Sequence, residues 1–308
     1  MICQNENVEI ILEPKDYKLY KCLDCGLIFA RKDKQQEEFN ILNQIEVYNN
    51  YYKENTGGRF SGLVESIVKI FRFMRAYKIY SLNTRAKSIL DIGSGRGFIL
   101  YFLRKYFHYE RAVGTQIAIN AYKFSTEKLK LEIYNKDLLE LSFEKKFDII
   151  SILHVLEHVE KPEEYIKKIY ELLDERGILW IEVPNYNAWT RKLVGKHWLA
   201  LDLKHHLFFF TPKSLTTLLE KYNFKIKKLE TFSLEYSTFT STQSVVNWIT
   251  NSDSYFFEWL SHRDSNPKII WHAFLFAIFF IPCFLINLLL YFSKSGEVIT
   301  ITAQKNGK

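Results

Sequence analysis

Residues 88–98, Ser-Ile-Leu-Asp-Ile-Gly-Ser-Gly-Arg-Gly-Phe, constrain the fold more than any other stretch of the chain. A short apolar run reaches Asp91, and Gly93, Gly95 and Gly97 then alternate with other residues before an apolar segment. Alternating glycines permit positive φ and allow a ligand to lie against bare backbone. The first amides of a following helix face a polar or anionic group. The stretch predicts strand, ligand-binding turn and helix, with a purely structural turn as the alternative.

The chain after this turn alternates between apolar strands and helical segments. We expect strands at 89–92, 112–116, 131–134, 147–153 and 178–183, and helices at 118–129 and 163–173, the second capped by Gly177. This alternation predicts an α/β fold with a parallel, doubly wound sheet. Ligands bind such sheets beyond the carboxyl ends of the strands. Gln116, Asp137, His154–His158 and Pro184–Asn187 all fall at those ends, which favours a single site.

Composition narrows the classes of partner and compartment. The chain has 308 residues, a formal net charge of +7 and four cysteines. Nucleic acid and an anionic membrane surface are both possible partners for this charge, but the lysines and arginines form no arginine-rich tract, so composition does not favour nucleic acid. Four cysteines in a chain of this length make no disulfide framework, and the N-terminus has no apolar signal segment. We therefore expect a cytoplasmic protein without a nucleic-acid partner.

The first 43 residues form a small unit with the pattern of a metal knuckle. Cys22 and Cys25 make a Cys-x-x-Cys-Gly turn, and Cys3 lies upstream with Glu6 where a second thiolate belongs. These four groups could hold zinc in a tetrahedral site. The alternative is a short hairpin with two buried thiols. Residues 44–84 follow with apolar side chains at helical spacing from Leu63 to Tyr77, which predicts a helix that packs on the next domain or covers its ligand as a lid.

Several motifs together resemble the class I S-adenosylmethionine-dependent methyltransferases. They are the sequences at 90–97 (LDIGSGRG), 147–148 (FD), 156–162 (LEHVEKP), 177–185 (GILWIEVPN) and 206–215 (HLFFFTPKSL). The branch includes ubiquinone-pathway and bacterial polysaccharide-locus enzymes. The resemblance implies a seven-stranded, Rossmann-like sheet with an antiparallel last strand, formed by residues 85–232 and 293–308. Residues 224–232 and 297–303 fit the sixth and seventh strands.

The resemblance also implies roles for individual residues toward S-adenosylmethionine. Asp91, Gly93, Gly95 and Gly97 would line its methionine and ribose part, Asp137 would meet the adenine edge, and His154 would lie beside the cofactor. Gln116 stands where the family has an acid that binds the ribose hydroxyls. An amide can accept from one hydroxyl and donate to another. The hydrogen bonds of a neutral amide are weaker than those of a carboxylate, so we expect this substitution to affect the affinity for the cofactor.

Methyl transfer to a hydroxyl needs a group that takes its proton, and imidazole suits that task at neutral pH. The candidates are His154, His158, His205 and His206. His154, Glu157 and His158 are spaced i, i+3 and i+4, so on a helix they would share one face. Such a trio could hold a divalent metal, supply a base, or be a structural acid–imidazole pair. His205 and His206 follow a loop expected to wall the acceptor pocket, as base or as loop anchor.

Residues 233–292 form an insertion before the last strand. The segment 269–292 contains no charged side chain and is long enough to cross a bilayer. A single crossing would leave the seventh strand on the wrong side, because that strand must rejoin the sheet. We therefore expect an in-plane helix or a re-entrant hairpin turning at Pro282, attached to the inner face of a membrane. A buried helix pair or a dimer interface is the alternative, and the oligomeric state stays open.

These patterns predict a membrane-associated methyltransferase that uses S-adenosylmethionine. The expected acceptor is a sugar hydroxyl of a cell-surface glycan or its lipid-linked precursor. O-methylation of a prenylated quinone precursor is the leading alternative, and a sugar C-methyltransferase is a weaker one. A membrane-bound scaffold that has lost the chemistry is the alternative outside enzymes, supported by Gln116 and by the incomplete cysteine knuckle.

Overall fold

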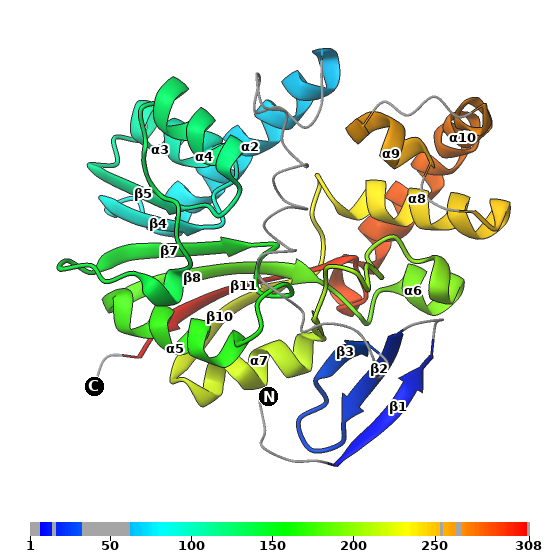
Figure 1. Cartoon of the computed structure of the whole chain (residues 1–308), viewed down its shortest axis with the longest axis horizontal. Helices are drawn as coiled ribbons and strands as arrows, with labels where there is room; N and C mark the ends of the chain where they lie inside the picture. Colours follow the sequence, from blue (N-terminus) through cyan, green and yellow to red (C-terminus); the bar gives the residue numbers. More distant parts are fainter. Residues whose placement is uncertain (1–6, 14–16, 33–61, 253–254, 263–266, 307–308) are drawn as a thin grey trace.

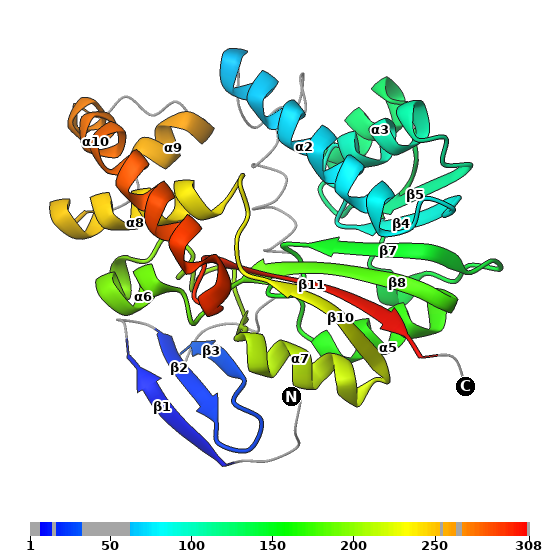
Figure 2. The ribbon, with the colours of Figure 1, turned by 180° about the vertical axis from the view of Figure 1, so that it is seen from behind.

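A central sheet covered by helices on both faces dominates the molecule (Figure 1). The computed structural model describes residues 7–13, 17–32, 62–252, 255–262 and 267–306. Within these residues, a small antiparallel sheet lies beside the central one, and a group of helices lies beyond one end of its strands (Figures 1 and 2).

The central sheet has seven strands in the order β10-β11-β8-β7-β4-β5-β6. Their bounds are β4 Ser88–Ile92, β5 Arg111–Thr115, β6 Glu132–Tyr134, β7 Phe147–Leu153, β8 Leu173–Pro184, β10 Phe224–Glu230 and β11 Val298–Lys305. β6, β5, β4, β7 and β8 pair in parallel, while β11 is antiparallel to both β8 and β10. The predicted α/β fold with an antiparallel last strand is confirmed.

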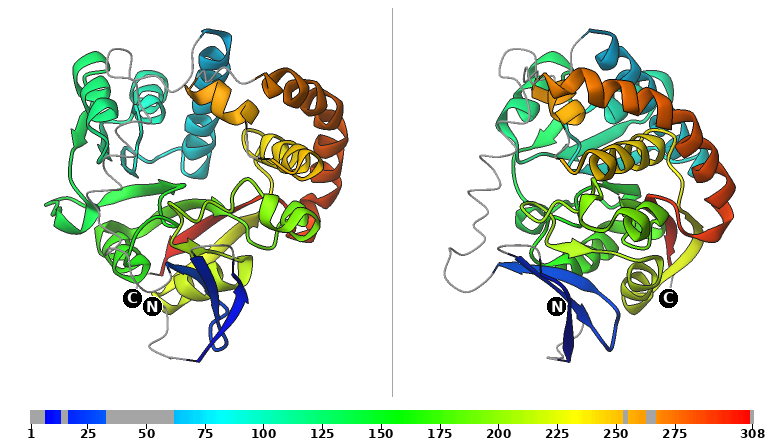
Figure 3. Two further views of the ribbon diagram at one scale, coloured as in Figure 1. Left: turned by 45° about the vertical axis from the view of Figure 1, so that its right-hand side comes forward. Right: turned by 90° about the vertical axis from the view of Figure 1, so that its right-hand side faces the viewer.

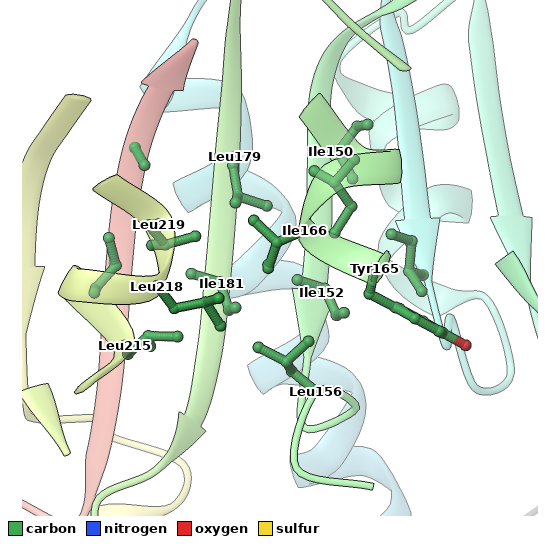
Figure 4. Packing of buried hydrophobic residues seen from close by; sticks show 14 of the residues in the cluster. Ile150, Ile152, Leu156, Tyr165, Ile166, Leu179, Ile181, Leu215, Leu218 and Leu219 are labelled. Atoms are coloured by element: carbon green, nitrogen blue, oxygen red, sulfur yellow. The ribbon is translucent and has the colours of Figure 1, made fainter. Parts of the chain in front are cut away.

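Helices α5 (Pro162–Leu172) and α7 (Pro212–Lys221) cover one face of the sheet. Their inward side chains and those of β7 and β8 form one buried cluster (Figure 4), which includes Ile150, Ile152, Ile166, Leu179, Ile181, Leu215, Leu218 and Leu219. Each such side chain contributes roughly 1.5–3 kcal/mol when fully buried. A capping box starts α7, because Thr211 Oγ1 accepts from the Ser214 amide while Ser214 Oγ accepts from the Thr211 amide.

Helices α2 (Gly62–Leu82) and α3 (Phe98–Tyr106) cover the opposite face. The face of α2 that is buried differs from the one that the apolar periodicity indicates. Ile67, Ile70, Met74 and Tyr77 are 42–58% exposed, while Ala76 and Ile79 are buried. Two guanidinium groups on the inward face, described below, pair with carboxylates of the domain. These ion pairs allow a charged face to turn inward.

Two boundaries after the glycine turn also differ from expectation. The helix expected at 118–129 is split into α4 (Ile119–Lys123) and a π-helix, η1 (Phe124–Lys128). Gly177 caps no helix, because α5 ends at Leu172 and Gly177 lies inside β8. The pairing of β8 with β7 shifts between Leu173 and Ile178, so the intervening residues bulge. A Cβ at Gly177 would lie 2.8 Å from Leu173 Cδ2, so this close approach favours glycine.

The N-terminal sheet is built on the large domain. It consists of β1 (Val8–Leu12), β2 (Tyr17–Cys22) and β3 (Ile28–Lys32), and β9 (Phe208–Phe209) adds a fourth antiparallel strand. Buried residues of this sheet pack with Tyr186 and Trp198 of the segment after β8. The sheet therefore supports the segment that carries His205 and His206.

Three helices, α8 (Ser237–Thr250), α9 (Tyr255–His262) and α10 (Lys268–Leu289), stand between β10 and β11 in the sequence. They lie on the side toward which β7 and β8 point (Figures 1 and 2), and α10 follows the outer edge of the molecule (Figure 3). α10 is one continuous helix with Pro282 inside it, so the expected hairpin at Pro282 is not formed. The short helix η4 (Leu290–Ser293) then leads into β11. Residues 268–293 are long and apolar enough to cross a membrane, and 17% of their most apolar window is buried.

Candidate active site

The glycine turn lies between the end of β4 and the start of α3. Gly93, Gly95 and Gly97 have φ values of 68°, 54° and 75°. A Cβ at Gly93 would lie 2.3 Å from Val155 Cγ2, and one at Gly97 would lie 2.5 Å from Leu131 Cδ1. The turn therefore packs directly against the segment after β7. Its bare backbone at the start of α3 fits the predicted role of these glycines in holding S-adenosylmethionine.

Asp91 is buried at the carboxyl end of β4, 3% exposed, and accepts a 2.6 Å hydrogen bond from Ser151 Oγ. Burial raises the pKa of Asp91 to about 6, although Ser151 and the guanidinium groups of Arg72 and Arg75 act in the opposite direction. S-adenosylmethionine carries a sulfonium and an ammonium group, so a bound cofactor would supply positive charge that favours the ionised carboxylate. The predicted contact between Asp91 and the methionine part is chemically consistent with this environment.

Gln116 and Asp137 both have local hydrogen bonds. Gln116 is 7% exposed, and its Oε1 accepts from the Ala118 amide at 2.9 Å. Asp137 Oδ1 accepts from the Leu139 amide at 2.8 Å, and its Oδ2 accepts from the Tyr165 hydroxyl. Both side chains stand at the ends of adjacent strands, β5 and β6, as predicted from the sequence. The side-chain amide nitrogen of Gln116 could donate a hydrogen bond to a ribose hydroxyl of the cofactor. The carboxylate of Asp137 has further lone pairs that could accept a hydrogen bond from adenine.

His154, Glu157 and His158 do not lie on a helix. Residues 156–158 form a turn, and His154 has a positive φ of 54°. The expectation that all three side chains face one way is wrong, because the turn directs the two imidazoles to different partners. His154 contacts Glu182, whereas His158 Nδ1 lies 2.9 Å from the His205 carbonyl oxygen. The metal trio of His154, Glu157 and His158 is therefore not assembled.

His154 is held between two carboxylates. Its Nε2 lies 3.0 Å from Glu182 Oε1, and its Nδ1 lies 3.4 Å from Glu157 Oε1. Burial alone would lower the pKa of His154, but the two neighbouring carboxylates, Glu157 and Glu182, outweigh burial and raise it to about 10. The ring also packs on Tyr236, with centroids 4.3 Å apart. His154 is thus an imidazolium at neutral pH and cannot act there as the base that takes a substrate proton.

Glu182 is the centre of a charged network that motif reading missed. It is 3% exposed and accepts from Arg75 Nη2 at 2.6 Å, and its Oε2 accepts from Thr300 at 2.8 Å. Burial acts to raise the pKa of Glu182, but Arg75 and His154 lower it. Arg75 also bonds Glu235, as does Arg72. An acid inside the otherwise apolar strand 178–183 was the signal in the sequence that could have revealed this network.

Glu157, His158 and His206 form a second cluster. One potential ligand atom from each lies within 4.8 Å of the others, and the His158 and His206 rings are 4.7 Å apart between centroids. The loop is held there because the Glu157 carbonyl oxygen accepts from the Leu207 and Phe208 amides at 2.8 and 3.1 Å. Burial and the neighbouring His158 lower the pKa of His206 to about 4. His206 is therefore neutral at pH 7, with a lone pair on one ring nitrogen.

The remaining predicted ligands lie outside this cluster. His205 Nδ1 bonds Asp202 Oδ2 at 2.6 Å and fits the role of loop anchor. Cys22 is buried at the end of β2, and Cys25 lies half-buried in the following turn. Cys3 and Glu6 lie outside the described residues, so zinc at the N-terminal knuckle stays a prediction.

Comparison with known proteins decides the family. A family model described as a methyltransferase domain matches residues 68–229, more than half of the chain. The chain belongs to this methyltransferase family. It is an S-adenosylmethionine-dependent methyltransferase, and the glycine turn at Gly93–Gly97 lies within the matched region.

Two relatives align with most of their own length. The ubiquinone biosynthesis O-methyltransferase of Pelagibacter ubique (strain HTCC1062) is 29% identical over 208 residues, 62% of this chain and 83% of that protein. The malonyl-[acyl-carrier protein] O-methyltransferase of Priestia megaterium (strain DSM 319 / IMG 1521) is 24% identical over 226 residues, 62% of this chain and 82% of that protein. The names of both describe O-methyl transfer, but to different acceptors.

Solved structures share the fold at low identity. A protein from Galdieria sulphuraria described as a sarcosine dimethylglycine methyltransferase aligns with 86% of this chain and 99% of its own, with a TM-score of 0.53 and 13% identity. The [4+2]-cyclase SpnF aligns with 76% of this chain and 80% of its own, with a TM-score of 0.50 and 14% identity. A cyclase on the same fold illustrates that the acceptor and reaction must be argued from the site.

Proposed function

We propose that this methyltransferase acts at the cytoplasmic face of a membrane and methylates a hydroxyl of a membrane-borne acceptor. The favoured acceptor is a sugar of a lipid-linked glycan precursor or of the finished surface glycan. The observation that carries the proposal is the outward face of α10, which is apolar along its whole length and structurally tied to the site.

The outward face of α10 and η4 is a single apolar stripe, spaced by three or four residues. It consists of Ile270, Phe274, Ile278, Ile281, Leu285, Leu288 and Phe292, all at least half exposed. Side chains at this spacing share one helix face. The opposite face is the buried one and carries His272, Cys283 and Asn287. On a helix at a water-exposed surface the outward face is polar and the buried face is apolar, and α10 shows the reverse. A lipid surface would cover the outward apolar stripe. Lys268 and Lys294 flank it and could reach anionic headgroups.

Hydrogen bonds connect this helix to the predicted acceptor wall. Asn287 Nδ2 donates to Ser241 Oγ of α8 at 2.8 Å, and Asn287 Oδ1 accepts from Trp189 Nε1 at 3.2 Å. Ser244 Oγ of α8 in turn accepts from the Leu199 amide at 2.9 Å. Trp189 and Leu199 belong to the segment between β8 and the His205–His206 loop. An acceptor with its lipid in the membrane would therefore be presented beside this wall.

The chemistry needs an aligned hydroxyl and a route for its proton. When bound, S-adenosylmethionine supplies a methyl carbon activated by a sulfonium. Transfer of the methyl group to an acceptor oxygen would require the site to align the hydroxyl with that carbon and to provide a base that takes the hydroxyl proton. Val155 packs on the glycine turn, and Glu157 and His158 lie two and three residues after it. The cluster of Glu157, His158 and His206 is accordingly the part of the site that we assign to the hydroxyl.

A prenylated quinone precursor is the second candidate acceptor. The likeness to the Pelagibacter ubique ubiquinone O-methyltransferase supports it, at 29% identity. A prenyl tail would also suit the apolar stripe of α10. The two acceptors differ in the bond between lipid and head group, because a sugar phosphate linkage is acid-labile and a prenylated ring is not.

Label transfer tests the proposal. Purified protein is incubated with methyl-labelled S-adenosylmethionine and membranes of the source cell, and the products are partitioned into organic and aqueous phases. We expect label in the organic phase that mild acid releases as a methylated sugar. Organic label that resists mild acid would instead establish the quinone-type acceptor. Label confined to the aqueous phase would overturn a lipid-linked acceptor, and no label with no bound cofactor would favour the scaffold.

A further inference from the structure

We propose that Glu157, His158 and His206 bind a divalent transition-metal ion. Their potential ligand atoms lie within 4.8 Å of one another, which small side-chain adjustments around an ion would accommodate. This set differs from the trio expected from spacing, because His206 takes the place of His154. His206 enters from the loop before β9, which the Glu157 carbonyl oxygen holds in place.

Backbone carbonyls orient both imidazoles for this role. His158 Nδ1 lies 2.9 Å from the His205 carbonyl oxygen, and His206 Nδ1 lies 3.0 Å from the Ala200 carbonyl oxygen. A carbonyl oxygen only accepts, so each Nδ1 carries the proton and the metal-binding nitrogen of each ring is Nε2. Metal-ligating histidines commonly donate their other N–H to such a carbonyl, which fixes the tautomer and the ring orientation.

Glu157 supplies the second, independent observation. Its side chain is 1% exposed, and neither carboxylate oxygen has a hydrogen-bond partner among the described residues. His154 Nδ1 lies 3.4 Å from Oε1 as an ion-pair contact, and the same ring is bonded to Glu182. A buried carboxylate without hydrogen bonds is costly, and a metal ion would satisfy it.

The ligand chemistry selects the ion. Two imidazoles and one carboxylate suit Zn²⁺, Co²⁺ or Mn²⁺, and they are a poor set for Ca²⁺ or Mg²⁺, which prefer all-oxygen sites. Three protein ligands leave a position open for water or for an acceptor oxygen. His158 and His206 are both half-buried, so a ligand can reach the ion from the site. Lowering the pKa of a bound hydroxyl would be its role, and this role, unlike the binding itself, rests on the proposed function.

Binding of Co²⁺ to the full chain, without cofactor or acceptor, tests the site. We expect wild-type protein to bind one more equivalent of Co²⁺ than Glu157→Gln, with visible d–d absorption from imidazole and carboxylate ligands. His206→Ala removes a proposed ligand and should weaken this binding by at least about tenfold, because losing even a hydrogen-bond partner of a metal ligand has an effect of that size. His205→Ala is the matched control, because His205 is adjacent in sequence and bonded to Asp202, and it should bind Co²⁺ like wild type. Any ion at Cys22 and Cys25 is common to all four proteins and cancels in the comparison.

Histidine NMR of the wild-type protein provides a readout that needs no variant. Co²⁺ should broaden the ring signals of His158 and His206 first, while those of His272 on α10 stay sharp. Equal Co²⁺ uptake by wild type and Glu157→Gln, or loss of binding in His205→Ala as well, would overturn the proposal. Because these measurements contain no acceptor, they can fail or succeed independently of the label-transfer result.

Discussion

His154 Nε2 and Glu182 Oε1 lie 3.0 Å apart, although 28 residues separate them in the sequence. The contact joins the turn after β7 to the end of β8, and Arg75 of α2 bonds the same carboxylate oxygen at 2.6 Å. One buried acid thus links α2 to the segment carrying Glu157 and His158. The network therefore fixes the position of these groups.

Replacing Glu182 with glutamine should strongly destabilise the fold. The substitution leaves the Arg75 guanidinium and the His154 imidazolium buried without their carboxylate, and breaking a buried ion pair in this way costs about 3–5 kcal/mol. Urea denaturation measures the free energy of unfolding. Glu9→Gln is the control, because the Glu9–Lys21 pair is 45% and 42% exposed and its loss should cost at most about 1 kcal/mol. Equal effects of the two substitutions would contradict the network.

Stability should fall as pH rises from about 7 to 10. The pKa of His154 is about 10 in the folded protein and 6.5 in the unfolded chain. Folded protein therefore binds more protons in this window, so the contribution is complete below pH 6.5 and lost as pH approaches 10. The free energy of unfolding of the wild-type protein, measured by urea denaturation, should be a few kcal/mol lower at pH 9.5 than at pH 7, on the order of 1.4 kcal/mol per pKa unit. In the His154→Gln variant, the difference in unfolding free energy between the two pH values should be smaller. If the variant shows the same pH dependence as wild type, a group other than His154 causes it.

Gly93→Ala should weaken cofactor binding by distorting the turn. The new Cβ would lie 2.3 Å from Val155 Cγ2, so the turn or the segment after β7 must shift. We expect the Kd for S-adenosylmethionine to rise at least about tenfold, a loss of about 1.4 kcal/mol. Gly26→Ala matches the backbone strain, since φ is 70° there and 68° at Gly93, but meets no atom within 4 Å. Its cofactor affinity should equal that of wild type in calorimetry. Partial recovery in Gly93→Ala/Val155→Ala would locate the clash.

Gln116→Glu should tighten cofactor binding. Glutamate has the same length, so it can still accept from the Ala118 amide, and its charge strengthens bonds from ribose hydroxyls. A gain of about fivefold in affinity, about 1 kcal/mol, is the expected scale. Calorimetry with S-adenosylmethionine and with S-adenosylhomocysteine should show it for both, because both carry the ribose. No gain would mean that the ribose is held elsewhere.

Lysines in the stripe of α10 should release the protein from lipid. Ile278, Ile281 and Leu285 lie consecutively on its exposed face, so their joint replacement by lysine removes apolar area without touching the buried side of the helix. Cosedimentation with anionic phospholipid vesicles should recover wild type in the pellet and leave the triple variant in the supernatant. Ile10→Lys/Leu23→Lys, at two exposed positions of the N-terminal sheet, is the control and should pellet like wild type. A wild-type protein that stays in the supernatant, or forms a dimer through α10, would refute the lipid-binding face.

Much of the fold was determined by the sequence alone, because its signals are local. The glycines at 93, 95 and 97 permit the positive φ that this turn adopts, and apolar runs alternating with helical periods specify a doubly wound sheet. The Thr211–Ser214 capping box is equally local. The apolar length of 269–292 predicted a helix, although its continuity through Pro282 was settled only by the structure.

The partners of the site's charged groups were decided by tertiary structure. Spacing placed His154, Glu157 and His158 together, but a positive φ at His154 sends its ring to Glu182. His206 joins Glu157 because a backbone carbonyl holds its loop and β9 pairs with β3, contacts between segments far apart in the chain. The inward face of α2 was also decided by tertiary structure, because the buried guanidinium of Arg75 is paired there with the carboxylate of Glu182. Sequence periodicity records which residues are apolar, whereas the pairing of buried charges depends on distances that only the folded chain sets.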